Sequence, residues 1–209
     1  MNDRLWQRMN ELVTRHYLMV VAFAIALPVA IVILVAAHTA VPEVGVEPER
    51  PAELVRGPIL PAADPVNLRI PALDLIAPFE EPLRVDANRE IEVPEAYDTV
   101  AYYEYGPTPG ELGPAVVLGH VDSVDGPAVF YSLGQLSPGD EIIIERSDGS
   151  VATFVVTALE RHLQAGFPTE QVYGDIDHAG LRLITCSGTF DQGEQRYSHN
   201  LIVFAELTA

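Results

Sequence analysis

Short apolar runs, separated by prolines and glycines, are the feature that most restricts the fold of this chain. Its 209 residues include 17 Pro and 15 Gly. That many helix-breaking residues argues against a helical bundle and favours many short elements joined by tight turns. Roughly eight short strands are expected, which predicts an all-β barrel. The predicted strands fall near residues 66–70, 75–79, 98–105, 115–118, 142–145, 151–159, 181–186 and 199–206.

The connections between these runs carry weaker signals. The sequence Ser147-Asp148-Gly149 predicts a hairpin turn between two strands. Residues 128–136 are expected to form one short helix or turn. Residues 161–180 form a long connection with room for one short helix. The predicted fold is therefore a barrel with only short helices and 3-10 turns.

A long uncharged segment precedes this domain. Residues 18–37 contain no charged side chain, and a helix of that length spans the roughly 30 Å of a bilayer core. Arg4, Arg8 and Arg15 precede the segment, whereas Arg50 is the first basic residue after it. The positive-inside rule then puts the N-terminus in the cytoplasm. A cleaved signal peptide is the alternative, which the small residues near 36–40 leave open.

These signals divide the chain into four segments. Residues 1–17 are the expected cytoplasmic N-terminus and 18–37 a single-pass transmembrane signal anchor. Residues 38–63, rich in Pro and Glu, are expected to form an extended extracytoplasmic linker. Residues 64–209 form the extracytoplasmic domain. The expected location is therefore the cell membrane, with the domain outside it.

Charge and composition exclude several classes of function. The formal net charge is −18 at pH 7, and the chain has no lysine. Such a surface repels phosphates, so nucleic acid is excluded as a partner. The spacing of His and Cys shows no metal-binding motif, and no phosphate-binding glycine motif is present. We therefore expect no metal and no cofactor.

The sole cysteine, Cys186, stands where an apolar run ends and the loop residues Ser187 and Gly188 begin. A buried structural cysteine is the simplest interpretation, since free cysteines are often buried. Outside the cytoplasm, however, an odd cysteine indicates an intermolecular disulfide or a reactive thiol. A nucleophilic thiolate also needs a nearby base or positive charge.

His120 is the candidate base. It follows the apolar run 115–118 in the sequence LGHVDS, a strand end of the kind that lines a cleft. Gly119 allows close backbone approach, and Asp122 or Ser123 is placed to orient the ring.

A cysteine and a histidine placed together are typical of acyl transfer, in which the thiolate attacks a carbonyl carbon. That reaction also needs a hydrogen-bond donor for the negatively charged oxygen of the tetrahedral intermediate. Arg196 is the nearest basic residue after Cys186 and offers a rigid, permanently charged fork. Arg182 is the rival and shares a strand face with Cys186, but it lies two pleats away, roughly 13 Å along the strand. Arg196 is therefore the predicted donor.

Taken together, these motifs resemble the sortase family of Gram-positive cysteine transpeptidases. The resemblance rests on GHVDS at 119–123, LITC at 183–186, the following Arg196, the anchor and the proline-rich linker. The segments TCSGTFD and YSHNLIVFA look most like class F sortases of actinobacteria. The family motif TLxTC is matched except at its first position, where Arg182 stands.

The resemblance implies an eight-stranded sortase-type β-barrel over residues 64–209. It implies Cys186 as nucleophile, His120 as general acid and base, and Arg196 as oxyanion or substrate stabiliser. Supporting or substrate-binding positions are expected at Asp122, Ser123, Thr185, Ser187 and Gly188. The 161–180 connection matches the family's substrate-binding loop.

The implied function is a membrane-anchored cysteine transpeptidase. Its partners would be surface proteins with C-terminal LPxTG-like sorting signals and an amine of a peptidoglycan precursor. Two alternatives stay open from the sequence. One is a hydrolytic cysteine peptidase with water as acceptor, and the other is a tethered β-barrel binding module whose cysteine is inert.

Overall fold

The computed structural model describes residues 55–86 and 91–208. Within those ranges, no helix has the length and apolar character needed to cross a bilayer. The predicted membrane segment 18–37 lies outside the described residues, as do segment 1–17 and most of the linker.

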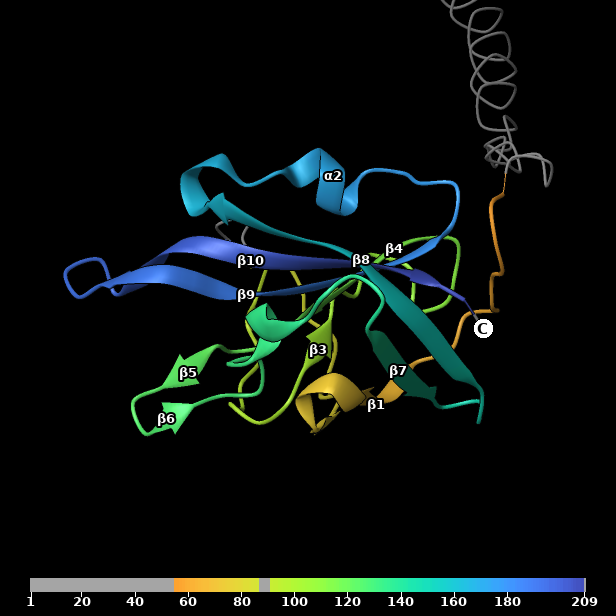
Figure 1. Ribbon diagram of the computed structural model, residues 1–209, viewed down its shortest axis with the longest axis horizontal. Helices are drawn as coiled ribbons and strands as arrows, with labels where there is room; N and C mark the ends of the chain where they lie inside the picture. The colour runs from red at the N-terminus through yellow and green to blue at the C-terminus, as the bar shows by residue number, and fades with distance from the viewer. Residues whose placement is uncertain (1–54, 87–90, 209) are drawn as a thin grey trace, which may run out of the picture. The chain divides into compact units, whose positions relative to one another are not determined.

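The domain is built on one eight-stranded sheet with the order β2-β1-β7-β8-β10-β9-β4-β3 (Figure 1). All neighbouring strands are antiparallel except β4 and β9, which are parallel. Isolated bridges join Phe79 to Val100 and Leu83 to Tyr103, which brings the two edges of the sheet together. The strands are β1 (Pro65–Ile70), β2 (Leu75–Pro78), β3 (Ala101–Tyr102), β4 (Gly113–Leu118), β7 (Glu141–Arg146), β8 (Val151–Leu163), β9 (Ala179–Asp191) and β10 (Arg196–Leu207).

The remaining elements are short. Strands β5 (Asp122–Ser123) and β6 (Gly126–Pro127) pair as a separate hairpin. The helices are the 3-10 turns η2 (Pro71–Leu73), η3 (Leu133–Gln135) and η4 (Gln164–Gly166), together with the α-helix α2 (Thr169–Tyr173). The prediction of a mainly β domain with eight strands in the sheet and short helical turns is confirmed.

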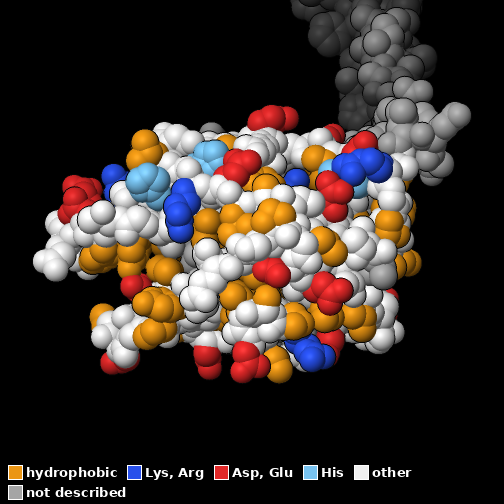
Figure 2. Space-filling model, viewed as in Figure 1, with side chains coloured by type: hydrophobic (Ala, Val, Ile, Leu, Met, Phe, Trp, Pro, Cys, Tyr) orange, Lys and Arg blue, Asp and Glu red, His pale blue; other side chains and the backbone are white. Residues whose placement is uncertain are grey.

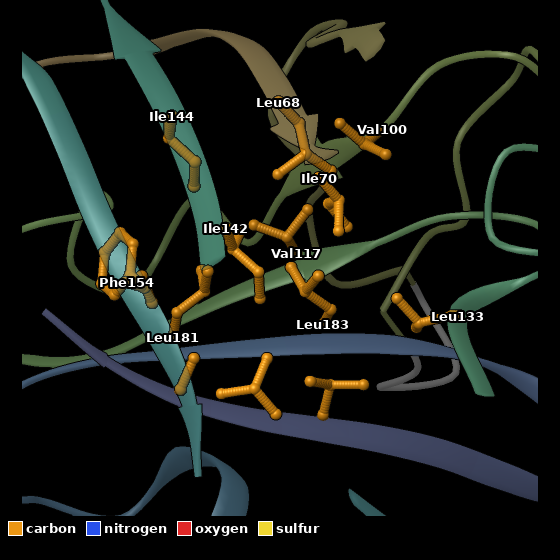
Figure 3. Close-up of a cluster of buried hydrophobic side chains, with 14 of the residues drawn as sticks. Leu68, Ile70, Val100, Val117, Leu133, Ile142, Ile144, Phe154, Leu181 and Leu183 are labelled. Carbon is orange, nitrogen blue, oxygen red and sulfur yellow. The ribbon is translucent and has the colours of Figure 1, made fainter. Parts of the chain in front are cut away.

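Alternating side chains create two apolar layers, one on each face of the sheet. The larger layer fills the concave interior and includes Leu68, Val117, Phe154, Leu181 and Leu183, all fully buried (Figure 3). Because side chains alternate along a strand, the residues between them point to the opposite face.

On that opposite face, the segment from η4 through α2 covers β4, β9 and β10 (Figure 1). Val172 of α2 is fully buried there against Val116, Ile184 and Ile202, with Phe204 alongside. This second layer matters for function, because Cys186 lies two residues beyond Ile184 and so points to the same face.

Strands β9 and β10 extend together beyond the rest of the sheet as a hairpin (Figure 1). A bulge between Tyr197 and His199 shifts the register of the pair. Bulges bend and twist a strand locally. The pairing continues beyond the bulge to Arg196 and Asp191, but in a register shifted from that of Cys186 and Asn200.

The acidic side chains are dispersed over the visible surface rather than gathered in one patch (Figure 2). Residues preceding β1 already contact the domain. Arg56 forms an ion pair with Glu206 at 2.9 Å, and the Leu60 amide donates to the Gly110 carbonyl at 2.8 Å. Contacts with the domain therefore begin before residue 64.

Candidate active site

The parallel pairing of β4 with β9 brings the predicted base next to the predicted nucleophile. Leu118, the last residue of β4, is the register partner of Ile184. Beyond the strand end, the Gly119 amide donates to the Ile184 carbonyl at 3.2 Å. The Thr185 hydroxyl donates to the Gly119 carbonyl at 2.8 Å. The residue before His120 is thus bonded to both residues that precede Cys186.

Glycine is required at position 119 by close packing. A Cβ there would lie 2.6 Å from Cδ2 of Phe130 and 2.9 Å from Cγ1 of Val129. Phe130 is fully buried and has little room to move. The glycine therefore lets the chain pass close to the core as it turns toward His120.

Cys186 is half-buried and lies opposite Asn200 on β10. Gln164, the first residue of η4, reaches over the pair. Its Nε2 donates to the Asn200 Oδ1 at 3.3 Å and makes a long hydrogen bond of 4.0 Å to the Cys186 Sγ. Cys186 is therefore accessible and lies among polar partners, which does not fit an inert core thiol.

Cys186 and His120 line the same pocket, a hollow of about 630 Å³. Its polar lining also includes Gln164, Asn200 and Thr185. Most of the remaining wall is apolar or aromatic, formed by Val85, Ile91, Val93, Pro94, Tyr103, Leu118, Phe167, Tyr173 and Ile184, and Gly119 and Thr169 complete it. Binding sites commonly combine an apolar wall with a few convergent polar groups.

The imidazole of His120 is oriented by the segment before β3. Its Nε2 lies 2.7 Å from the Pro94 carbonyl oxygen. Because a carbonyl oxygen only accepts, Nε2 carries the hydrogen and neutral His120 keeps its lone pair on Nδ1. Tyr97 packs on the ring with centroids 4.7 Å apart. The ring is thus held in one tautomer and one orientation.

The electrostatic surroundings disfavour the thiolate in the free protein. Burial raises the pKa of the Cys186 thiol, and the negative charge of Asp122 raises it further. Each effect penalises the charged form of the sulfur. The nucleophile therefore depends on a proton acceptor at the moment of attack, a role that fits His120.

The predicted arginine is not brought to this pocket. Arg196 is the register partner of Asp191 and begins β10, four residues before Asn200 and roughly 13 Å along the strand. It does not line the pocket with Cys186. The catalytic role of Arg196 stays a prediction.

Arg182, the other arginine considered as oxyanion donor, is buried. Its guanidinium stacks on the Phe204 ring at 4.8 Å, and burial lowers its pKa.

The supporting positions fall into two groups. Thr185 lines the pocket and is buried. Asp122, Ser187 and Gly188 instead line a separate hollow that also contains His199. There the Tyr197 hydroxyl donates to the Asp122 carboxylate.

Ser123 also lies away from the histidine ring, since its hydroxyl donates to the Gly126 carbonyl at 3.3 Å. Gly188 has a positive φ of 83°, a conformation that suits glycine. The orienting role considered for Asp122 and Ser123 is filled in the structure by the Pro94 carbonyl and Tyr97.

The arrangement can carry out nucleophilic acyl transfer. It supplies a thiol, a histidine with a free ring nitrogen and amide donors beside the sulfur. Among residues 55–86 and 91–208, no group of three or more His, Cys, Asp or Glu side chains is arranged to hold a metal ion. Sequence reasoning did not identify Gln164, Pro94 or Tyr97, since none of them belongs to a motif.

Comparison with known proteins agrees with this chemistry. A family model described as "Sortase domain" matches residues 68–208. No curated protein sequence gives a significant match.

Solved structures of sortases share the fold. A lid mutant of sortase A from Corynebacterium diphtheriae is 20% identical with a TM-score of 0.55, and the match covers 71% of each chain. Sortase C-1 from Actinomyces oris is 20% identical with a TM-score of 0.55, over 70% of this chain and 76% of that one. A sortase D5 transpeptidase from Clostridium perfringens is 18% identical with a TM-score of 0.53, over 70% and 79%.

Proposed function

Because this chain belongs to the sortase family of cysteine transpeptidases, we propose that it cleaves LPxTG-like sorting signals and transfers the acyl part to an amine of a peptidoglycan precursor. The observation that carries the proposal is the shared pocket of Cys186 and His120. Their relative position is fixed by the Thr185 hydrogen bond to Gly119. The segments TCSGTFD and YSHNLIVFA are the basis for proposing class F within the family.

The first half-reaction forms a thioester. His120 accepts the thiol proton, and the Cys186 sulfur attacks the carbonyl carbon of the Thr–Gly bond of the signal. A C–S bond forms while the carbonyl electron pair moves to oxygen. When the adduct collapses, the C–N bond breaks and His120 returns the proton to the departing amine.

The second half-reaction reverses these roles with a new amine. The nitrogen of the incoming neutral amine attacks the thioester carbonyl, and His120 accepts one proton from that nitrogen. The C–S bond breaks, and His120 returns that proton to the leaving thiolate of Cys186. Microscopic reversibility assigns the same histidine to both proton transfers.

The wall of the pocket suits an extended peptide with apolar side chains. Ile91 and Val93 line one part of it, and Phe167 and Tyr173 line another. A Leu-Pro pair would bury apolar surface against such side chains, worth about 25 cal/mol per Å² removed from water. The pocket therefore supports a leucine- and proline-containing signal as the substrate class.

We also propose that residues 18–37 anchor the protein in the cell membrane as a single span, with the N-terminus cytoplasmic and the domain outside. The uncharged length of this segment and the arginines before it support the proposal. Protease treatment of intact protoplasts tests it. We expect the domain to be digested while a tag on residue 1 stays protected, and protection of both would contradict the orientation.

Product analysis tests the transferase function. The full-length chain in detergent micelles is incubated with an LPxTG peptide, with and without a diglycine or triglycine amine. We expect a ligated product with the amine and slow hydrolysis without it, and neither with the variant Cys186→Ala. Hydrolysis at the same rate in both conditions would instead identify a peptidase.

A further inference from the structure

Two side-chain amides meet at the nucleophile. Gln164 donates to the Asn200 Oδ1 at 3.3 Å, and the same nitrogen lies 4.0 Å from the Cys186 Sγ. Asn200 is held by the strand pairing directly opposite Cys186. An amide nitrogen carries two hydrogens. Asn200 engages one of them, which leaves the other directed at the sulfur.

The chemistry at this sulfur needs such a donor. When a thiolate adds to a carbonyl, negative charge develops on oxygen, and a preorganised donor lowers the barrier. The described residues that line the pocket include no arginine or lysine. His120 is engaged in proton transfer and through its Nε2 with Pro94, so it does not also supply this donor.

We propose that Gln164 is a catalytic residue, whose amide donates to the oxyanion that forms as Cys186 attacks the substrate, and that Asn200 is the residue that positions it. The proposal rests on the acyl-transfer function given above. The C–S bond forms, the carbonyl electron pair moves to oxygen, and the Gln164 N–H bonds that oxygen. When the tetrahedral adduct collapses, the electron pair on oxygen re-forms the carbonyl and the C–N bond breaks, with His120 protonating the departing amine.

The position of Gln164 fits this role. An amide nitrogen 4.0 Å from the sulfur can lie about 2.7–3.1 Å from the oxygen of an adduct on that sulfur, which is the distance kept by oxyanion donors. Gln164 also follows directly after β8, whose last residue Leu163 pairs with His199 of β10. The amide is therefore carried by the end of a paired strand, which reduces the reorganisation needed during reaction.

Two variants of Gln164 and one matched control test the assignment. Gln164→Leu removes the donor, and Gln164→Glu keeps the shape but replaces the donor with an acceptor. Gln171→Leu is the control, because Gln171 lies in α2 of the same connection and donates to Glu160 at 3.0 Å instead. All are made in the full-length chain, in detergent micelles.

Steady-state transfer with an LPxTG peptide is the first measurement. We expect both Gln164 variants to lower kcat about 100-fold with little change in KM, as for loss of one oxyanion donor. Gln171→Leu should match the parent. Asn200→Leu should lower kcat as well, and the losses in Gln164→Leu/Asn200→Leu should be less than additive because both act through one amide. Parent-like kcat in both Gln164 variants, or a loss confined to KM, would overturn the proposal.

Alkylation by iodoacetamide at pH 7 is the second measurement and needs no substrate. Loss of a hydrogen bond to the thiolate should raise the pKa of Cys186 in Gln164→Leu and lower the thiolate fraction about tenfold. A more basic thiolate is also more nucleophilic, so we expect the alkylation rate to fall only about threefold. If the parent protein does not cleave the LPxTG peptide, the proposed substrate is wrong, but the alkylation measurement still tests Gln164. An unchanged alkylation rate in Gln164→Leu would overturn the proposed role of Gln164.

Discussion

The hydrogen bond from Thr185 to the Gly119 carbonyl links the two halves of the catalytic pair, and its removal gives a quantitative prediction. The bond is 2.8 Å long, and Thr185 is 4% exposed. Thr185→Val keeps the shape and the β-branched side chain but leaves the buried carbonyl without this donor. An unsatisfied buried group costs about 1–3 kcal/mol.

The same substitution should also reduce activity. Gly119 immediately precedes His120, so a shift of its carbonyl moves the imidazole relative to the Cys186 sulfur. Misplacement of a catalytic group by about 1 Å costs on the order of 100-fold in rate. We expect Thr185→Val to lower kcat by at least about tenfold, with a smaller effect on KM.

Thermal unfolding and transfer kinetics of the full-length chain measure both effects. A loss of about 2 kcal/mol corresponds to a Tm lower by about 4–8 °C for a protein of this size. Thr157→Val is the matched control, because the Thr157 hydroxyl also donates to a backbone carbonyl, that of Phe204 at 3.2 Å, but at an exposed position on β8. Parent-like Tm and kcat in Thr185→Val would refute the reasoning.

Three further predictions concern the surroundings of the pair. Gly119→Ala should cost about 1–3 kcal/mol by overpacking, since its Cβ would lie 2.6 Å from Phe130; an unchanged Tm would contradict this. Asp122 raises the pKa of Cys186, so Asp122→Asn should lower that pKa and shift the pH profile of alkylation to lower pH, and a shift to higher pH would contradict the sign. Arg196→Ala should lower kcat less than Gln164→Leu does, because Arg196 lies outside the pocket; a larger loss would instead support the predicted guanidinium role.

The fold was largely predictable because its strands carry local patterns. In β1, Leu68 and Ile70 are buried and Arg69 is exposed, as alternation requires. Val66 breaks the pattern at 43% exposure, next to an irregularity in the pairing of β1 with β7. Such irregularities depend on the neighbouring strand, so the sequence of one strand does not reveal them.

The catalytic pair was predictable for a different reason. Cys186 and His120 both follow apolar runs, and each run ends at the same edge of a parallel strand pair. The predicted strand end at Cys186 was wrong, because β9 continues through Ser187 and Gly188 to Asp191. The parallel pairing with β4 nevertheless ends at Leu118 and Ile184, so the residues just beyond that point lie close together. Motifs at the ends of apolar runs therefore carried information about the tertiary structure.

The positions of Gln164 and Arg196 relative to Cys186 could not be predicted from the sequence. The position of Gln164 depends on how far β8 extends and on its pairing with β10, which a single segment does not encode. Arg196 is close to Cys186 in sequence, but the long β9–β10 hairpin carries it toward Asp191. Distance along the chain is a poor guide across a hairpin, because separation depends on where the turn falls.

The covalent intermediate is the most direct test of the central claim that Cys186 is the nucleophile of an acyl-transfer site. The full-length chain is mixed with an LPxTG peptide without added amine, quenched in acid and measured by intact mass and by peptide mapping. We predict a mass increase equal to the acyl fragment ending in the threonine, located on Cys186, removed by hydroxylamine and absent in Cys186→Ala. Cleavage of the peptide by Cys186→Ala at the parent rate, or an acyl group on another residue, would contradict the account.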